Sequence, residues 1–422
     1  MTESYPHSMA PAAKTLAQWL SYLESIHPTT IDMGLERVKQ VAQRLTLDFS
    51  STLVITVAGT NGKGTTCRFL EQALLAQGKS VGVYSSPHLL DYRERIRINN
   101  ELCSEADYCR VFSVIEQARE DISLTYFEFG TLAAMVMMLE ASVDVAILEV
   151  GLGGRLDATN ILDPDIAVIT TIGLDHQDWL GDTREQIAVE KAGIMRRGSK
   201  AIIGELHPPA TLYEEVNRLE AKALWAQRDF SVVETDHGWQ WQCGAAILTD
   251  LPAPQILKQN ISTALATLHA LQLMPDEQQL RSLIAETSLP GRRQRLSSAP
   301  EVIVDVAHNP QATAAMVEWL TTQSYNNLFC VVGMLKDKAL EETLAVFTDV
   351  PAQWYLATTA GPRGCAANAL KNALPPAHRT RTSCYDSVIN AYVSCRDVAK
   401  PGDTILVFGS FLTVADVLAF HA

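Results

Sequence analysis

Apolar residues gather along the first half of the chain in short, nearly continuous runs rich in β-branched side chains. Such runs are typical of buried strands, and they occupy residues 53–57, 81–84, 143–150, 166–172 and 201–203. Between most of them apolar residues recur every three or four positions, which predicts helices. Apolar strands separated by helices indicate a mostly parallel sheet covered on both faces, so this half is predicted to be an α/β domain.

The second half repeats this pattern after two interruptions. Residues 229–249 form short polar and aromatic pieces that predict a small antiparallel addition, and helices are predicted at 258–271 and 277–287. The run 288–300, SLPGRRQRLSSAP, has the composition of a linker. A second, smaller α/β domain of Rossmann type is then predicted from strands at 302–306, 328–332, 354–357 and 404–408, alternating with helices at 311–321, 338–347 and 388–398.

Length and composition mainly exclude other classes of protein. The 422 residues suit two or three domains. The 34 Lys and Arg residues against 48 Asp and Glu residues give a formal net charge of −14, which disfavours binding to nucleic acid or to anionic membranes. Eight cysteines without a CxxC pair indicate reduced thiols, and neither a secretory signal nor a membrane-spanning run is evident. We therefore expect a cytoplasmic location.

The strongest local signal is a glycine-rich segment between the first predicted strand and a helix. It comprises Gly59, Thr60, Asn61, Gly62, Lys63, Gly64 and Thr65. Glycines let backbone N–H groups converge on an anion, the helix N-terminus favours negative charge, and a lysine can reach terminal phosphates. The standard motif has glycine at the place of Val57 and Ser or Thr at the place of Gly64, so this is a variant phosphate loop. The alternative is a tight turn with a surface lysine.

Three polar side chains follow predicted parallel strands beside this loop. Glu149 ends one strand, Ser86 follows another, and Asp175–His176 follows a third. Carboxyl ends of parallel strands meet at one edge, where open sheets bind ligands, and a carboxylate there can hold Mg²⁺. Solvated strand-end and turn residues are the alternatives. A second glycine cluster, 151–154, has Leu156 where a dinucleotide fingerprint needs glycine, which argues against a nicotinamide enzyme.

Other candidates have equally ordinary alternatives. Lys191 lies on an amphipathic helix, where a solvated lysine is the simpler interpretation. The aromatic segment 125–129 suits core packing as well as a ligand pocket. Four charged residues near the linker would face the first domain if the linker is short, or else lie on the surface: Arg292, Arg293, Asp305 and His308.

Together these motifs resemble one family, the ATP-dependent ligases that join amino acids to carboxylates, comprising the Mur ligases and the folylpolyglutamate synthases. Glycine after the loop lysine is similar to the folate branch. Further matches to that branch run in order along the chain: YSSPHL at 84–89, EVGLGGRLDATN at 149–160, LDH at 174–176, EKAGI at 190–194, PGR at 290–292, DVAHNP at 305–310 and GSF at 409–411.

The resemblance implies an enzyme that adds L-glutamate to dihydropteroate, giving dihydrofolate, and further glutamates to reduced folates through an acyl phosphate. It implies ATP as co-substrate, two Mg²⁺ ions and a monovalent cation such as K⁺. The chain is expected to act as a monomer. Three alternatives are a Mur-type ligase on a cell-wall precursor, a monofunctional folylpolyglutamate synthase and a nucleotide-binding switch. Gly64 and the segment 125–128 argue against the Mur-type ligase.

The resemblance also implies a role for each candidate residue. The expected domains are a flexible tail at 1–13, a P-loop ATPase-like domain at 14–289, a linker at 290–300 and a glutamate-ligase domain at 301–422. The implied catalytic residues are Lys63, Lys191 and His176. Asn260, Arg292 and Asp305 complete the ATP site begun by the phosphate loop. The implied metal ligands are Ser86, Glu149, His176 and Lys191, the last carbamylated by CO₂. The implied dihydropteroate pocket comprises Thr125, Tyr126, Phe127, Glu128, Leu156, Asp157 and Ala158.

Overall fold

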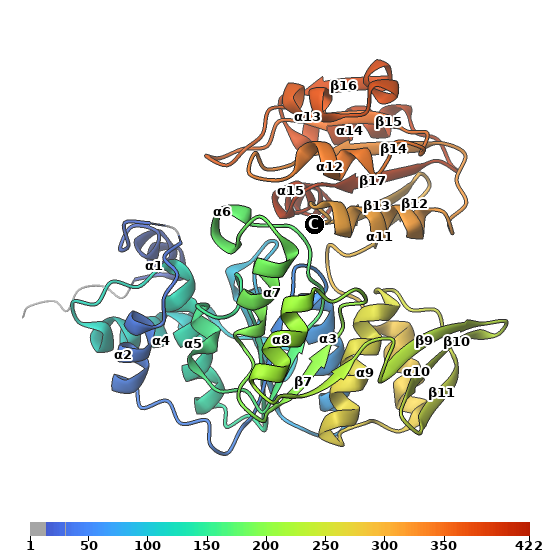
Figure 1. Ribbon diagram of the computed structural model, residues 1–422. Helices are drawn as coiled ribbons and strands as arrows, with labels where there is room; N and C mark the ends of the chain where they lie inside the picture. Colours follow the sequence, from blue (N-terminus) through green and yellow to red (C-terminus); the bar gives the residue numbers. More distant parts are fainter. Residues whose placement is uncertain (1–13, 30) are drawn as a thin grey trace, which may run out of the picture.

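Figure 1 shows the computed structural model, which describes residues 14–29 and 31–422. Two α/β domains lie one above the other, the larger coloured blue to yellow and the smaller orange to red. The flexible tail predicted at 1–13 lies outside the described residues. Within the described part of the chain, no helix is both long enough and apolar enough to cross a membrane.

The larger domain contains an eight-stranded sheet in the order β4-β3-β2-β5-β1-β6-β7-β8. Its strands are β1 (Leu53–Ala58), β2 (Val81–Tyr84), β3 (Ile96–Ile98), β4 (Glu101–Leu102), β5 (Val145–Glu149), β6 (Ile166–Ile169), β7 (Lys200–Ile203) and β8 (Lys222–Trp225). The strands from β2 to β8 in this order run parallel, whereas β3 and β4 pair antiparallel at one edge. This confirms the predicted mostly parallel sheet.

Helices cover both faces of this sheet because alternate strand residues point to opposite sides. On one face Ile55 and Val57 pack against α3 (Lys63–Ala76), α9 (Lys258–Leu271) and α10 (Glu277–Glu286). The other face is covered by α1 (Leu16–Leu23), α2 (Glu36–Arg44), α4 (Glu105–Arg119), α5 (Tyr126–Glu140), α7 (Arg184–Ala192) and α8 (Ala210–Arg218). The short α6 (Gln177–Leu180) lies near the second domain (Figure 1).

The predicted antiparallel addition is present as a separate three-stranded sheet. It consists of β9 (Phe230–Thr235), β10 (Gly238–Cys243) and β11 (Ala246–Leu251) in the order β11-β10-β9. Trp239 and Trp241 of β10 are buried in the same apolar cluster as α9. The addition therefore extends the core of the larger domain.

The smaller domain contains a six-stranded sheet in the order β12-β13-β17-β14-β15-β16. Its strands are β12 (Gln294–Ser298), β13 (Glu301–Asp305), β14 (Leu328–Val332), β15 (Gln353–Ala357), β16 (Thr382–Tyr385) and β17 (Thr404–Phe408). All neighbours pair parallel except β12 with β13. Both faces carry helices, which are α11 (Pro310–Leu320), α12 (Leu340–Ala345), α13 (Ala367–Ala373), α14 (Val388–Val398) and α15 (Phe411–His421).

One boundary differs from the prediction. The expected linker, 290–300, contains β12, so the sheet of the smaller domain begins inside it. β12 is an edge strand that pairs on one side only, and its side chains are exposed or half-buried. Because such a strand needs no apolar face, its Arg- and Ser-rich sequence carries no strand signal.

Candidate functional site

The phosphate loop joins β1 to α3, and its shape requires glycine. Gly62 is the N-cap of α3 and has φ +84°. A Cβ at Gly62 would lie 2.4 Å from the Asn260 side-chain oxygen, so no larger residue fits without movement. The loop is fixed to the end of β6, where Thr171 Oγ1 accepts the Asn61 N–H at 2.9 Å. The first N–H groups of α3 therefore form a preorganised site for an anion.

The Lys63 ammonium folds back over this loop. Its Nζ donates to the backbone oxygen of Gly59 at 2.8 Å and lies 3.4 Å from that of Thr60. Among the described residues Lys63 has no carboxylate within ion-pairing distance. Its charge is therefore available to a phosphate that enters the loop.

The loop faces a cavity of about 450 Å³ between the two domains. The predicted ATP-binding and metal-binding residues all line it. From the larger domain these are Gly59, Thr60, Asn61, Gly62, Lys63, Gly64, Thr65, Ser86, Glu149, His176, Lys191 and Asn260, and from the smaller domain and the segment leading to it Arg292 and Asp305. The structure therefore brings these candidates together in one site.

Glu149 is a buried carboxylate that lines this cavity. It ends β5 opposite Val57 of β1, which places it beside the phosphate loop. Burial raises the pKa of Glu149, and the charges of Lys63 and Arg292 counteract that rise. Among the described residues, its one hydrogen bond comes from the Ser86 backbone N–H at a long 3.4 Å. Most lone pairs of the carboxylate therefore remain available to a cation.

His176 supplies a neutral imidazole at the same edge of the sheet. It lies after β6 in the left-handed conformation, with φ +53°. Burial lowers the pKa of His176 to about 4, and the nearby positive charge of Lys338 adds to the effect. A neutral imidazole has a lone pair free for a metal ion.

Ser86, Glu149 and His176 fit a Mg²⁺ site in which the protein supplies only some of the ligands. In the described part of the chain no group of three or more His, Cys, Asp or Glu side chains is arranged to hold a metal ion. Mg²⁺ suits such a place because it retains several waters and takes its other oxygens from phosphates. The donor set present, a carboxylate, a hydroxyl and an imidazole, is consistent with an ion held jointly with ATP.

Lys191 is buried rather than solvated, contrary to the simpler interpretation of its helix. The residue as a whole is 3% exposed. It lines the cavity, and its amine has no hydrogen bond or ion pair among the described residues. Burial, together with the charge of Lys63, lowers the pKa of Lys191 from 10.5 to about 7. A large fraction of the amine is therefore uncharged near neutral pH.

Residues at and beyond the domain junction complete the cavity. The Arg292 guanidinium lies 4.9 Å from the centre of the Phe411 ring, and burial lowers its pKa. Asp305 accepts the backbone N–H groups of Arg293 at 3.0 Å and Ala307 at 2.8 Å.

Asn260 of α9 donates to Thr65 Oγ1 at 2.7 Å and so contacts the start of α3.

Comparisons with known proteins agree with this geometry. Residues 57–208 match the Mur ligase middle domain, and residues 291–411 match the glutamate ligase domain of Mur ligases. The dihydrofolate synthase/folylpolyglutamate synthase of Escherichia coli K12 is 48% identical over 96% of both chains. That of Haemophilus influenzae is 42% identical over 97% of this chain and 98% of the relative. The chain belongs to the dihydrofolate synthase/folylpolyglutamate synthase group of the Mur ligase family.

Solved structures of this group have the same fold. Escherichia coli FolC in complex with DHPP and ADP superposes with a TM-score of 0.93 at 47% identity, covering 98% of this chain and 99% of that one. A bifunctional folylpolyglutamate synthase/dihydrofolate synthase with Mn, AMPPNP and L-glutamate bound has a TM-score of 0.90 at 47% identity. It covers 97% of this chain and 98% of that one.

In this Mur ligase fold, the segment predicted to bind dihydropteroate lies beside the cavity rather than in its lining. Thr125 and Glu128 cap α5: Thr125 N–H donates to the Glu128 carboxylate at 2.7 Å, and Glu128 N–H donates to Thr125 Oγ1 at 3.2 Å. Glu128 also pairs with Arg37 at 3.1 Å. Both side chains thus have structural partners, and their role in binding stays a prediction.

The other members of that predicted pocket surround the second glycine cluster. The Phe127 ring packs against Gly151, where a Cβ would lie 2.6 Å from it. The Asp157 carboxylate accepts the N–H groups of Gly151 at 3.0 Å and Leu152 at 2.9 Å. Tyr126, Leu156 and Ala158 lie next to these residues in sequence, Ala158 being buried. This group is connected to the cavity through Gly151, which lines it.

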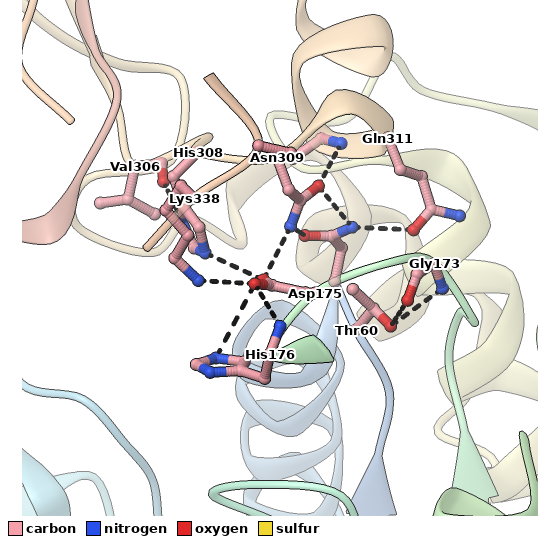
Figure 2. Close-up of polar contacts among 12 residues, drawn as sticks. Thr60, Gly173, Asp175, His176, Val306, His308, Asn309, Gln311 and Lys338 are labelled. Atoms are coloured by element: carbon pink, nitrogen blue, oxygen red, sulfur yellow. Dashed lines mark hydrogen bonds and ion pairs between the residues drawn. The ribbon is translucent and has the colours of Figure 1, made fainter. Parts of the chain in front are cut away.

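Three polar residues of the smaller domain at this site were not selected from the sequence. Asn309 and Gln311 contact Asn61 of the phosphate loop, and Lys338 contacts Asp175 (Figure 2). Asn309 belongs to the DVAHNP motif, which could have identified it. Lys338 lies at the start of a predicted helix, and its partner is distant in sequence, so no local pattern distinguishes it.

Proposed function

We propose that this chain is an ATP-dependent ligase that joins L-glutamate to dihydropteroate and then adds further glutamates to reduced folates. One observation carries the proposal: a phosphate loop, a buried strand-end carboxylate and residues of the glutamate ligase domain line a single cavity. The names of the relatives and the ligands of the solved structures support it. They do not favour a cell-wall precursor or a single activity.

The reaction explains why this cavity needs charge more than a nucleophile. A carboxylate resists attack by an amine because its carbonyl is a poor electrophile and oxide is a poor leaving group. In the proposed reaction the pterin carboxylate attacks the γ-phosphate of ATP, which gives an acyl phosphate and ADP. The glutamate amine then adds to the acyl carbon, loses a proton, and the tetrahedral intermediate expels phosphate. Positioning and charge neutralisation dominate such phosphoryl transfer.

The residues of the cavity divide this work. The N–H groups at the start of α3 and the Lys63 ammonium neutralise charge on the β- and γ-phosphates. Arg292 and Asp305 approach the nucleotide from the smaller domain, and Asn260 supports the phosphate loop through Thr65. The two-domain cavity excludes water from the acyl phosphate when the substrates are bound.

Divalent ions complete the charge balance. Ser86, Glu149 and His176 would hold one Mg²⁺ ion, and Lys191 would help to position a second. These residues would thereby bring positive charge close to the phosphates, where a divalent ion would stabilise the negative charge that develops. Mn in a solved relative supports divalent metal use in this group. We also propose a monovalent cation such as K⁺, as the family resemblance implies.

Lys191 has the chemistry required for carbamylation. An uncharged amine attacks the carbon of CO₂ and releases one proton, which leaves a carbamate with one negative charge. The depressed pKa of Lys191 supplies the uncharged amine. The nitrogen has no polar partner in the part of the chain that the structure describes, which leaves it open to the cavity. The carbamate would place an anion where the lysine would otherwise repel metal ions.

The proposed setting is cytoplasmic. The eight free cysteines support it, because thiols stay reduced in the cytoplasm. One chain supplies every residue of the site described above, so we expect a monomer to be active.

ATP hydrolysis tests the proposal directly. Purified protein with Mg²⁺ is given dihydropteroate, L-glutamate, both or neither, and ADP and dihydrofolate are quantified. We expect ADP formation to depend on both substrates together and to match dihydrofolate in amount. A ligase for cell-wall precursors would ignore dihydropteroate, and a nucleotide switch would show no joint dependence. Either result would overturn the proposal.

A further inference from the structure

The Asp175 side chain is largely buried where the two domains meet, and its carboxylate receives polar contacts from both of them (Figure 2). Oδ1 accepts the Lys338 ammonium at 2.6 Å and the backbone N–H of His176 at 2.9 Å. Oδ2 accepts the Asn309 amide at 3.3 Å and lies 3.4 Å from His308 Nε2. Three of these four partners belong to the smaller domain, although Asp175 belongs to the larger one.

The Lys338 side chain is buried against Asp175. Its side chain is 6% exposed, and that of Asp175 is 9% exposed. Among the described residues Asp175 is the one hydrogen-bond or ion-pair partner of the Lys338 ammonium. Removing one member of such a buried pair leaves the other charged and desolvated, which is costly. The pair therefore favours the arrangement in which the two domains touch.

A second set of contacts also holds the two domains together. The Asn61 and Asn309 side-chain amides exchange hydrogen bonds of 3.1 and 2.9 Å, and Asn61 also donates to Gln311 at 2.8 Å. Asn61 is part of the phosphate loop, and His176 is the residue after Asp175. The smaller domain thus holds two segments of the larger domain that line the nucleotide cavity (Figure 2).

We propose that Asp175 and Lys338 form an interdomain clamp that closes the smaller domain over the nucleotide and positions His176 for its metal ion. The proposal rests on the proposed function, because it assumes that ATP and a metal ion bind in this cavity. Asp175 and Lys338 are positioning residues in it. Asp175 holds the backbone N–H of His176, a residue with φ +53°, so releasing Asp175 frees the imidazole to turn away.

The clamp predicts a kinetic effect that a general loss of stability would not produce. Opening the domains weakens every contact that needs both of them, so the concentration of Mg²⁺–ATP at half-saturation rises. Once substrates have closed the cavity, Lys63 and Glu149 are unchanged, so turnover at saturation falls much less. We expect Lys338→Met to raise half-saturation for Mg²⁺–ATP about tenfold or more, with kcat within about threefold of the original.

Lys336→Met is the matched control. Lys336 lies two residues earlier in the same loop, but its side chain is exposed and has no polar partner among the described residues. Lys338→Arg keeps the charge and should restore most of the affinity. Equal half-saturation in Lys338→Met and Lys336→Met would overturn the clamp.

Small-angle X-ray scattering tests closure without turnover. We expect nucleotide-free Lys338→Met to have a larger radius of gyration than the original protein, and Lys336→Met to match the original. Asp175→Asn should open the domains as well, and the double variant should be no more open than either single variant. Equal radii for all of these folded proteins would overturn the clamp. A failed ligase assay with the original protein would instead overturn the proposed function and leave the scattering result standing.

Discussion

At the residue scale, the site is recognisable by buried charges that have no salt-bridge partner. Glu149 and Lys191 are buried and Arg292 is half-buried, and none of the three has an oppositely charged side chain within 4.0 Å in the described part of the chain. Burial of an unpaired charge destabilises a fold. Such groups are expected where a protein binds charged ligands, and here all three line one cavity.

Lys63→Ala tests the charge at the phosphate loop. Loss of the ammonium should lower kcat by about 10²–10³-fold, the usual effect of removing one electrostatic stabiliser of a transition state. Circular dichroism should be unchanged, because the lysine's contacts with the rest of residues 14–29 and 31–422 are hydrogen bonds to loop carbonyls. Lys222→Ala, a change of an exposed lysine on β8, is the control. Near-normal dihydrofolate formation by Lys63→Ala would contradict the assigned role.

Gly62→Ala tests the shape of the loop, with Gly78→Ala as a matched change at the other end of α3. Both glycines have positive φ, +84° and +71°, so both variants incur a similar backbone strain of about 1 kcal/mol. Only at Gly62 does the new Cβ meet Asn260, since nothing lies within 4 Å of a Cβ at Gly78. Calorimetric titration with Mg²⁺–ATP analogue should show weaker binding for Gly62→Ala alone. Equal weakening in both variants would contradict the loop geometry.

Lys191→Met tests the buried amine through stability. The pKa of Lys191 is lower in the folded protein than in the unfolded chain, so protonation favours unfolding. The penalty is absent above pH 10.5, grows as the pH falls towards 7, and is constant below that value. In CO₂-free buffer Lys191→Met should therefore be more stable by roughly 2–5 kcal/mol at pH 6 and by little at pH 10.

Urea unfolding at pH 6, 8 and 10 measures this difference, with Lys222→Met as the exposed control. Equal stability of Lys191→Met and the original protein at pH 6 would show that the amine is not desolvated. Carbamylation is tested separately, because ¹³C-labelled bicarbonate should add a carbamate resonance to the original protein and none to Lys191→Met.

At the element scale, Thr125 has two assigned roles, as the N-cap of α5 and as a predicted dihydropteroate contact, and a comparison with a second capping box can distinguish them. Thr125→Ala removes the cap and should cost about 1 kcal/mol of stability. Ser104→Ala removes the capping box of α4, which is exposed, at a similar cost. If the dihydropteroate pocket is correctly predicted, Thr125→Ala alone should raise KM for dihydropteroate, with KM for glutamate unchanged. Identical kinetics in the two variants would restrict Thr125 to capping.

The same scale shows what the sequence could and could not predict. β2, α9 and α14 begin and end at the predicted residues, because buried elements carry a continuous apolar pattern. The edge strands β12 and β16 are largely exposed and have no such pattern, so they were not predicted. The strand-end residues could be placed in one site because parallel strands end at one edge. The Lys338 contact could not, since it depends on how the two domains are packed.

At the scale of the whole molecule, the site belongs to neither domain alone. The phosphate loop and the strand-end residues come from the larger domain, whereas Asp305, His308 and Asn309 come from the smaller one. Each domain has its own sheet and its own apolar clusters. Each can therefore remain folded while their relative position changes, and a ligand that contacts both domains favours the arrangement in which they touch.

Hydrogen exchange can test this linkage. A non-hydrolysable ATP analogue with Mg²⁺ at 100 times its Kd stabilises the bound form by roughly 2.7 kcal/mol. Slower exchange should appear in both 59–66 and 305–312, because both segments must be in place for binding. The β9–β11 sheet contributes no residue to the cavity lining, so its local opening should be unaffected. Protection confined to 59–66 would mean that the nucleotide is held by the larger domain alone, and the cavity between the domains would then have no part in binding it.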